Sequence, residues 1–370
     1  MRKCCFLWSS VRRTSNYSQQ RRLREEVLDL RFRGALVLCM AVVCLVLTGC
    51  EGPQKEEEKN SIRIGISLYR GDDTFINNIR SELEIKAKEY EQEHGIKVTL
   101  DIQEAKGSQS TQNNQVERLI SLGCDVLCVN PVDRMDATVV IDKAMTAGVP
   151  VVFFNRQPVE EDMNRWDRLY YIGVDAKETG ILQGQLIADI YRENPEMVDR
   201  NGDGVVSYVL LEGESNHQDA MVRTEWSIQT LKDEDVPIER IIGGIANWER
   251  SQASALMEQW ISTYPDAIEL VVSNNDDMAL GAIDALERAG IEGVNVVGID
   301  GTNPGLEAME SGKLLGTVSS NKEIYGSAVI ELAASCALEE PLPQEYPLTD
   351  GKYYWIPQEI LVTAQSGTLY

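Results

Sequence analysis

The sequence predicts an α/β protein with two doubly wound lobes, each built around a parallel β-sheet. From Ser61 onward, short runs rich in Val and Ile alternate with longer segments of helical periodicity. The short runs are apolar throughout, which is typical of parallel strands that helices cover on both faces. The roughly 310 residues after the N-terminal segment exceed the usual size of one α/β core, so we expect two lobes.

The expected strands are the following runs, in chain order: 62–68, 97–102, 126–130, 151–154, 170–173, 205–211, 241–245, 270–273, 294–299 and 315–318. Most of the segments between them have apolar residues every three or four positions, as in 75–90, and we expect these segments to be helices. In such sheets, ligands bind beyond the carboxyl ends of the strands.

The first 50 residues have the pattern of an export signal. A cluster of arginines at 21–33 precedes an apolar run at 35–47, which leads into Thr48-Gly49-Cys50. At about 13 residues, the apolar run is too short to span a bilayer. The run's ending, Leu-Thr-Gly-Cys, resembles the bacterial lipoprotein box, which implies cleavage before Cys50 and lipid on its thiol. We therefore expect a signal peptide at 1–49 and a lipid-anchored, extracytoplasmic protein, at the cell surface or in the periplasm.

Composition narrows the class of partner. Residues 50–60, which are rich in Glu and Lys, are expected to form a disordered tether behind the lipidated cysteine. The net charge of −24 argues against a nucleic-acid partner, which would need basic groups to meet phosphates. Cys124, Cys128 and Cys336 follow the anchor. We expect the first two to be buried on one face of the strand at 126–130, and we expect neither a disulfide scaffold nor a zinc site.

Polar side chains follow many of the expected strands. They are Asp72-Asp73-Thr74 with Phe75, Asn155, Asn274-Asn275-Asp276, Asp300, and Ser319-Ser320-Asn321. Each one alone is also what a helix N-cap or an Asx turn would use. Their recurrence at strand ends instead indicates a shared binding site.

The segment 199–223, DRNGDGVVSYVLLEGESNHQDAMVR, begins like a calcium-binding loop. Its oxygen ligands at alternating positions would be Asp199, Asn201, Asp203, the backbone carbonyl of Val205, and Ser207. The twelfth position, where a bidentate Glu would complete a helix–loop–helix site, is Leu210, so the loop alone lacks one carboxylate. The alternative is a solvated turn, since Asp, Asn and Gly are ordinary turn formers.

The same segment ends in His217-x-Asp219-x3-Arg223, which has helix-compatible spacing. Such side chains offer fixed donors and acceptors and suit a ring of neighbouring hydroxyl groups. Phe75 and Trp248 follow strands in different predicted lobes and could clamp the two apolar faces of a pyranose. The alternative for each aromatic ring is core packing.

Taken together, several segments resemble the bacterial galactose/glucose-binding proteins, the substrate receptors of sugar ABC transporters. They are IRIGISLYRGDDTF, VPVVFFNRQP, YYIGVDAKETGILQG, the segment 199–223, ELVVSNNDDMALGA and VVGID. The resemblance covers 62 to about 362. It implies the type I periplasmic binding protein fold, with lobes at 61–173 plus 319–356 and at 174–318 plus 357–370, joined by three crossovers.

The resemblance also implies specific site residues. The sugar contacts would be Asp73, Phe75, Asn155, His217, Asp219, Arg223, Trp248, Asn275, Asp300 and Ser320. A structural Ca²⁺ would be held by Asp199, Asn201, Asp203, Val205, Ser207 and, completing the site, Glu269. Two positions depart from the family pattern: Ser207 replaces a longer amide side chain, and Ser320 stands where an Asn is expected.

The implied function is that of a monomeric, non-enzymatic receptor for D-galactose or D-glucose, with methyl galactoside as a further candidate. It would deliver the sugar to the permease subunits of an ABC importer. A sensor that feeds a chemoreceptor or sensor kinase, or a receptor for another monosaccharide, is the alternative. A glycosidase could use Glu249 and Asp300, but the sequence gives no separation between them. A transcription regulator would need a helix-turn-helix and a basic face before the core, where the chain has an export signal instead.

Overall fold

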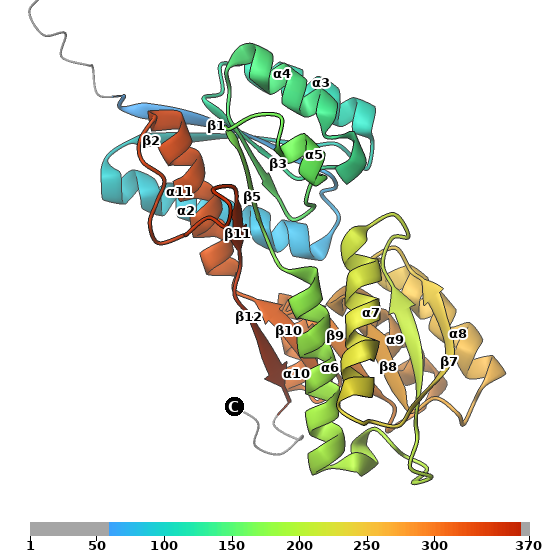
Figure 1. Ribbon diagram of the computed structural model, residues 1–370. Coiled ribbons are helices and arrows are strands. Elements are labelled where there is room, and N and C mark those ends of the chain that lie inside the picture. The colour runs from blue at the N-terminus through green and yellow to red at the C-terminus, as the bar shows by residue number, and fades with distance from the viewer. Residues whose placement is uncertain (1–58, 364–370) are drawn as a thin grey trace, which may run out of the picture. The chain divides into compact units, whose positions relative to one another are not determined.

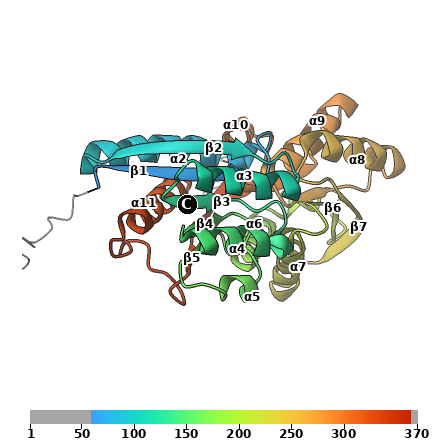
Figure 2. The same cartoon turned by 90° about the horizontal axis from the view of Figure 1, so that it is seen from above.

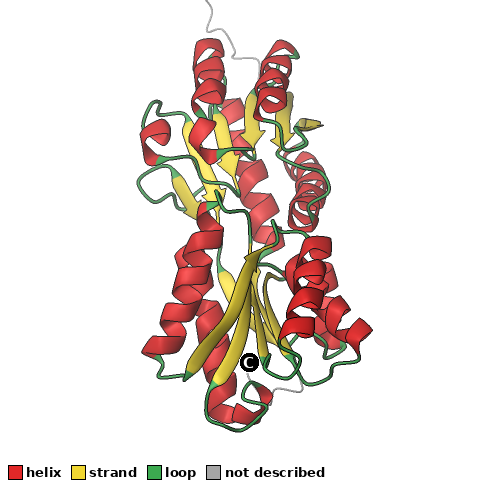
Figure 3. Cartoon of the chain, turned by 90° about the vertical axis from the view of Figure 1, so that its right-hand side faces the viewer, coloured by secondary structure: helices red, strands yellow, loops and turns green. Residues whose placement is uncertain are grey.

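The computed structural model describes residues 59–363, which form two α/β lobes (Figure 1). Each lobe has a six-stranded, mostly parallel sheet with helices on both faces (Figure 3), so the predicted fold class is confirmed. The predicted signal peptide at 1–49, the predicted lipidation site Cys50 and most of the predicted tether lie outside the described residues. No helix within 59–363 is sufficiently long and apolar to span a membrane.

The first sheet is parallel throughout and has the strand order β11-β5-β4-β3-β1-β2. Its strands are β1 (Ser61–Leu68), β2 (Lys97–Glu104), β3 (Val126–Val129), β4 (Val151–Phe154), β5 (Leu169–Gly173) and β11 (Tyr353–Trp355). Figure 2 shows β1 and β2 side by side. One face packs against α2 (Thr74–His94) and α11 (Lys322–Leu338), and the other against α3 (Gln109–Ser121) and α4 (Thr138–Ala147). The short η1 (Arg134–Asp136) and α5 (Glu160–Met163) lie in the connections.

The second sheet has the order β12-β10-β9-β8-β6-β7, with β12 antiparallel to β10. Its strands are β6 (Val206–Glu212), β7 (Ile238–Ile245), β8 (Leu270–Ser273), β9 (Asn295–Asp300), β10 (Gly316–Ser320) and β12 (Gln358–Val362). One face packs against α6 (Ala176–Glu193) and α7 (Gln218–Asp233). The other packs against α8 (Arg250–Thr263), α9 (Asp276–Ala289) and α10 (Asn303–Glu310). The short η2 (Pro195–Met197) follows α6.

Within residues 59–363, the chain passes between the two sheets three times. It leaves the first sheet after β5, returns between β10 and α11, and leaves again between β11 and β12. Because α11 packs on β1, β3 and β4 of the first sheet while β10 belongs to the second, sequence-distant segments complete each lobe. This interleaving ties the lobes together at one side and leaves their strand ends free to form a site.

One local prediction is wrong. Cys124 and Cys128 do not share a face, because β3 begins only at Val126 and Cys124 lies in the turn after α3. Cys124 packs in the core beneath α3 and α4, whereas Cys128 packs in the core beneath α2 and α11. Both thiols are free and buried, as is Cys336. They act as small apolar core residues.

Candidate functional site

An inner cavity lies where strand ends of both sheets meet. It is lined by every predicted sugar contact except Ser320: Asp73, Phe75, Asn155, His217, Asp219, Arg223, Trp248, Asn275 and Asp300. Tyr69, Ile76 and Arg156 complete the lining. The carboxyl ends of parallel strands therefore gather side chains that lie far apart in the sequence.

Three of these residues also cap helices whose N-termini face the cavity. Asp73 Oδ1 accepts a hydrogen bond from the Ile76 amide at the start of α2, over 2.9 Å. Asn275 caps α9, and His217 caps α7 by accepting from the Asp219 amide through Nδ1 at 3.2 Å. The sequence left open whether such residues cap helices or line a site. These three do both. It also fixes each side chain and turns the positive end of a helix towards the cavity.

Backbone strain is concentrated at this cavity. Asn155, Trp248 and Asp300 all have positive φ, at 63°, 68° and 114°. Non-glycine residues rarely adopt such angles, and each costs on the order of 1–3 kcal/mol. The surrounding fold holds these residues in the strained conformation, in which their side chains line the cavity, and this strain lowers the stability of the fold.

Arg223 is the charged centre of the site. It is 6% exposed, and its Nη1 donates to the carbonyl of Asn274 at 3.0 Å. Nη1 also lies 3.6 Å from Oδ1 of Asp300, and Nη2 lies 3.9 Å from Oδ2 of Asp219. These are ion-pair distances beyond hydrogen-bond range. Nε of Arg223 is buried and has no hydrogen-bond partner among the described residues.

The protonation states follow from burial. Burial raises the pKa of Asp219 and raises the pKa of Asp300 well above its usual value, while the Arg223 guanidinium opposes both shifts. Burial, together with the nearby Arg156 and Arg223, lowers the pKa of His217 well below its usual value. His217 is therefore a neutral imidazole. Because its Nδ1 accepts from the Asp219 amide, Nε2 carries the proton and is a donor.

Two aromatic rings from different lobes frame the inner cavity. Phe75, in the first turn of α2, meets Tyr325 edge to face with ring centroids 6.2 Å apart. Trp248, between β7 and α8, meets the His217 ring edge to face at 5.2 Å. Each ring is thus braced by a neighbour from its own lobe. Each ring packs on its own lobe, as the core-packing alternative expects, and each also lines the inner cavity. The clamp on a pyranose stays a prediction.

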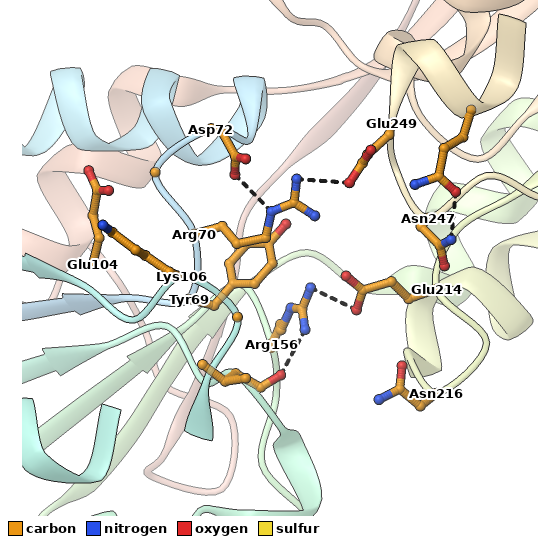
Figure 4. A pocket seen from close by; sticks show the side chains of 14 residues that line it. Tyr69, Arg70, Asp72, Glu104, Lys106, Arg156, Glu214, Asn216, Asn247 and Glu249 are labelled. Carbon is orange, nitrogen blue, oxygen red and sulfur yellow. Dashed lines mark hydrogen bonds and ion pairs between the residues drawn. The ribbon is translucent and has the colours of Figure 1, made fainter. Parts of the chain in front are cut away.

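A larger cleft of about 910 Å³ adjoins the inner cavity (Figure 4). Ion pairs cross this cleft between the lobes: Arg70 Nη2 to Glu249 Oε1 at 3.1 Å, and Arg156 Nη2 to Glu214 Oε2 at 3.0 Å. The inner cavity measures only about 30 Å³, room for two or three water molecules. A larger ligand can therefore enter only when the lobes separate.

Some site residues differ from the sequence prediction. Tyr69 and Arg156, which line both cavities, were missed; the available signal was that Tyr69 directly follows the first strand and Arg156 directly follows Asn155. Ser320 ends β10, is buried, and does not line the inner cavity; its Oγ has no hydrogen-bond partner among the described residues. Glu249 and Asp300 line different cavities, so they do not face one glycosidic bond.

The predicted metal loop folds around two buried carboxylates. Asp199 accepts from the amides of Gly202 and Gly204, at 2.9 and 3.0 Å. Glu269 reaches in from the edge of β8 and accepts from the amides of Asn201 and Ser207, at 3.0 and 2.8 Å. Glu269 is 1% exposed and Asp199 is 8% exposed.

Across the part of the chain that the structure describes, no group of three or more His, Cys, Asp or Glu side chains is placed to hold a metal ion. Three of the predicted ligands, Asp199, Asp203 and Glu269, are carboxylates, and they do not form such a group. The other predicted ligands are an amide, a backbone carbonyl and a hydroxyl. Backbone amides of the loop hold the side chains of Asp199 and Glu269 in place.

Comparison with known proteins places this geometry in context. Residues 64–340 match the family described as periplasmic binding protein domain. The D-galactose/methyl-galactoside binding periplasmic protein MglB of Haemophilus influenzae is 36% identical over 276 residues, which are 74% of this chain and 81% of that protein. The xylitol-binding protein of Mycolicibacterium smegmatis is 30% identical over 87% of this chain and 83% of its own length.

A solved structure agrees in fold. The ABC transporter solute binding protein of Bacillus halodurans with bound myo-inositol has a TM-score of 0.68 and 28% identity, and the match covers 84% of this chain and 97% of that one. The two lobes and their mostly parallel sheets are thus those of a type I periplasmic binding protein.

Proposed function

The chain belongs to the periplasmic binding protein domain family, and we propose that it is an extracytoplasmic receptor that reversibly binds D-galactose or D-glucose. The family consists of solute-binding proteins rather than enzymes. The receptor would act as a monomer and deliver its sugar to the permease subunits of an ABC importer. Methyl galactoside is a further candidate, because the Haemophilus relative is described as binding it.

One observation carries the proposal: the charged and polar side chains of the inner cavity are held in place, yet several lack a full set of partners. Arg223 stands at ion-pair range from Asp219 and Asp300 without a hydrogen bond to either, and its buried Nε has no partner in the described chain. Buried polar groups normally have partners, because leaving one unpaired costs about 1–3 kcal/mol. A sugar hydroxyl, which both donates and accepts, can bridge such a guanidinium and a carboxylate.

The remaining lining suits a pyranose ring. The Asp73, Asp219 and Asp300 carboxylates can accept from hydroxyl groups, while Arg223 and Nε2 of His217 can donate. Phe75 and Trp248 offer apolar faces from opposite lobes. Binding would occur with the lobes apart and would close them, because the closed inner cavity is too small for entry.

The choice of hexose rests on the Haemophilus relative, whereas other similar proteins are described with xylitol or myo-inositol. A tryptophan-fluorescence titration with D-galactose, D-glucose, xylitol and myo-inositol tests this choice. We expect saturable quenching or enhancement with one of the two hexoses, and no such signal change in Trp248→Phe. A response to xylitol or myo-inositol alone would contradict the hexose assignment while leaving the polyol-binding pocket intact.

We also propose a structural Ca²⁺ at Asp199, Asn201, Asp203, the Val205 carbonyl, Ser207 and Glu269. Its support is that neither Asp199 nor Glu269 has an ion-pair partner among the described residues, although both are buried. Burying carboxylates is costly unless they are paired or bind a cation, and these oxygens are hard ligands of the kind that calcium prefers. The ion would neutralise the pair and fix the loop ahead of β6, away from the inner cavity.

Finally, we propose lipid attachment at Cys50, supported by the Leu47–Cys50 box behind its apolar run. Cells supplied with a clickable fatty acid should label this protein. A Cys50→Ala variant should lose both the label and membrane association, and persistence of either in that variant would contradict the anchor. The charged segment after Cys50 would then be the tether between the membrane and the receptor.

A further inference from the structure

Tyr69 and Arg156 are the two side chains shared by the linings of the inner cavity and the outer cleft. Tyr69 directly follows β1, and Arg156 is the second residue after β4; β3 lies between these two strands in the sheet. Both are buried, at 3% and 6% exposure. Because they line both spaces, Tyr69 and Arg156 stand between the inner cavity and the outer cleft, and we call these two side chains the partition.

The partition is fixed at several points. The Arg156 guanidinium lies 3.8 Å over the centre of the Tyr69 ring, and the Tyr69 hydroxyl donates to Asp73. Arg156 Nη1 donates to the Val132 carbonyl at 2.8 Å, and its Nη2 lies 3.0 Å from Glu214 of the opposite lobe. Figure 4 shows Arg156 reaching across towards Glu214 beside the Tyr69 ring. Neither side chain can swing away without breaking a charge-assisted bond or the stacked contact.

The space behind the partition is large and polar. The outer cleft measures about 910 Å³, and its lining includes the amide side chains of Asn216, Asn247 and Gln252 and the charged Lys106 and Glu104. Such amides and charged groups can donate to and accept from the hydroxyl groups of a second sugar ring. The cleft would therefore accept a larger glycoside if the partition were absent.

We propose that Tyr69 and Arg156 set the upper size limit of the ligand: they confine it to one sugar ring and bar glycosides whose second ring would extend into the outer cleft. This inference rests on the proposed hexose binding. It makes the Arg156–Glu214 pair a specificity device, because the pair closes the partition only when the lobes have come together around the ligand.

The chain supplies a matched control. Arg70 and Glu249 form a second ion pair between the lobes at 3.1 Å, but they line only the outer cleft. Removing this pair also deletes an ion pair between the lobes, but it leaves the side chains between the inner cavity and the outer cleft in place. If weaker lobe closure alone changes sugar binding, the variants that lack either pair should change equally.

The test uses the purified protein and three forms: wild type, the partition variant Arg156→Ser/Glu214→Ser, and the control variant Arg70→Ser/Glu249→Ser. Both members of each interlobe pair are replaced, so that neither leaves its counter-charge behind; Asp72, which also pairs with Arg70, is exposed to solvent. Titration calorimetry compares the preferred hexose with disaccharides that carry it at the non-reducing end, namely lactose and melibiose for galactose or cellobiose and maltose for glucose. The measured quantity is the ratio of the two dissociation constants.

We expect wild type to favour the hexose by about a hundredfold or more, and the partition variant to lower that ratio by about tenfold or more for at least one linkage. In the control variant both sugars should weaken together and leave the ratio within about twofold. Tyr69→Phe, which keeps the ring but loses the bond to Asp73, should likewise keep the ratio.

Three results would overturn the inference: wild type that binds a disaccharide as tightly as the hexose, a partition variant with an unchanged ratio, or equal changes in partition and control variants. Circular dichroism checks that each variant is folded, and Arg156→Ser alone replaces the double variant if that one is not. Failure of wild type to bind any hexose is a different outcome, which refutes the proposed function itself.

Discussion

Nη1 of Arg223 lies 3.6 Å from Oδ1 of Asp300, close enough to form an ion pair and too far apart to form a hydrogen bond. The two residues come from α7 and the end of β9, and both are almost fully buried. Their separation leaves a donor and an acceptor facing the same inner cavity. A ligand with adjacent hydroxyl groups can satisfy both, so we regard this spacing as the central feature of the site.

Replacing Arg223 should weaken sugar binding strongly. Arg223→Ala leaves Asp219 and Asp300 buried without their cation, and losing one side of a buried charged pair costs about 2–5 kcal/mol. We expect the hexose dissociation constant to rise by at least about tenfold in calorimetry. Arg250→Ala is the matched control, because Arg250 pairs with Asp284 at the exposed surface of the same lobe, and hexose affinity should stay unchanged. Equal losses in both variants would mean that Arg223 has no special place at the ligand.

Ser320 should govern selectivity within the sugar panel. Its buried Oγ has no partner in the described chain, and the adjacent Asn321 is engaged in capping α11 through Oδ1, 3.0 Å from the Ile324 amide. A longer amide at 320 could reach from β10 towards the inner cavity and add a hydrogen bond there. We expect Ser320→Asn to change the galactose-to-glucose affinity ratio by about threefold or more. An unchanged ratio in a folded, sugar-binding variant would show that position 320 does not read the ligand.

Chelation should lower the thermal stability of the protein. A cation that binds only the folded state adds about 2.7 kcal/mol at one hundred times its dissociation constant, so EGTA should reduce Tm while leaving hexose affinity nearly intact. In Asp203→Ala, a predicted ligand is missing and the EGTA shift should shrink or vanish. Differential scanning calorimetry measures both. The calcium proposal is wrong if wild type shows no shift, or if the variant shifts as much as wild type.

Stability should depend on pH through Asp276. This carboxylate is fully buried and accepts hydrogen bonds from Thr302 and Thr317, and burial raises its pKa to about 6. The folded protein therefore binds a proton more tightly than the unfolded chain, whose Asp has a pKa near 3.9. The stability that Asp276 contributes is present below about pH 4 and is lost as pH rises to about 6, on the order of 2–3 kcal/mol.

The test compares wild type with Asp276→Asn by urea denaturation at several pH values. The Asn side chain keeps one acceptor oxygen and replaces the other with an amide donor, so its hydrogen bonds to the threonines change equally at every pH, and it carries no titrating group at this position. We therefore expect its free energy of unfolding to improve relative to wild type as pH rises from about 4 to about 6. A difference that stays constant across this range, or that changes in the opposite direction, would show that the Asp276 pKa is not raised.

The sequence predicts most of the fold because the buried strands are continuous apolar runs. β3 and β4 are completely buried, and their wholly apolar sequences VLCV and VVFF predict that burial. By contrast, β11 and β12 were not predicted. They are short, only partly buried and held by pairing with distant strands, so their sequences carry little local signal.

The site was predictable where polar residues follow strands, since parallel topology brings such positions together. Backbone geometry was not predictable: nothing in the sequence indicates that Asn155, Trp248 and Asp300 take positive φ. Tyr69 and Arg156 were missed for a related reason. The place of Arg156 in the cavity wall depends on Glu214, which only the folded arrangement of the lobes brings within reach, whereas Tyr69 is held by Asp73 four residues further along the chain.

Titration calorimetry of the purified protein with D-galactose and D-glucose tests the central claim most directly. The cavity between the lobes, with Arg223 poised beside Asp219 and Asp300, predicts reversible one-to-one binding of at least one of them below about 100 μM, or roughly −5.5 kcal/mol. Loss of that heat in Arg223→Ala would tie it to the inner cavity. If neither hexose nor its methyl glycoside binds below about 100 μM, the proposed hexose function is contradicted.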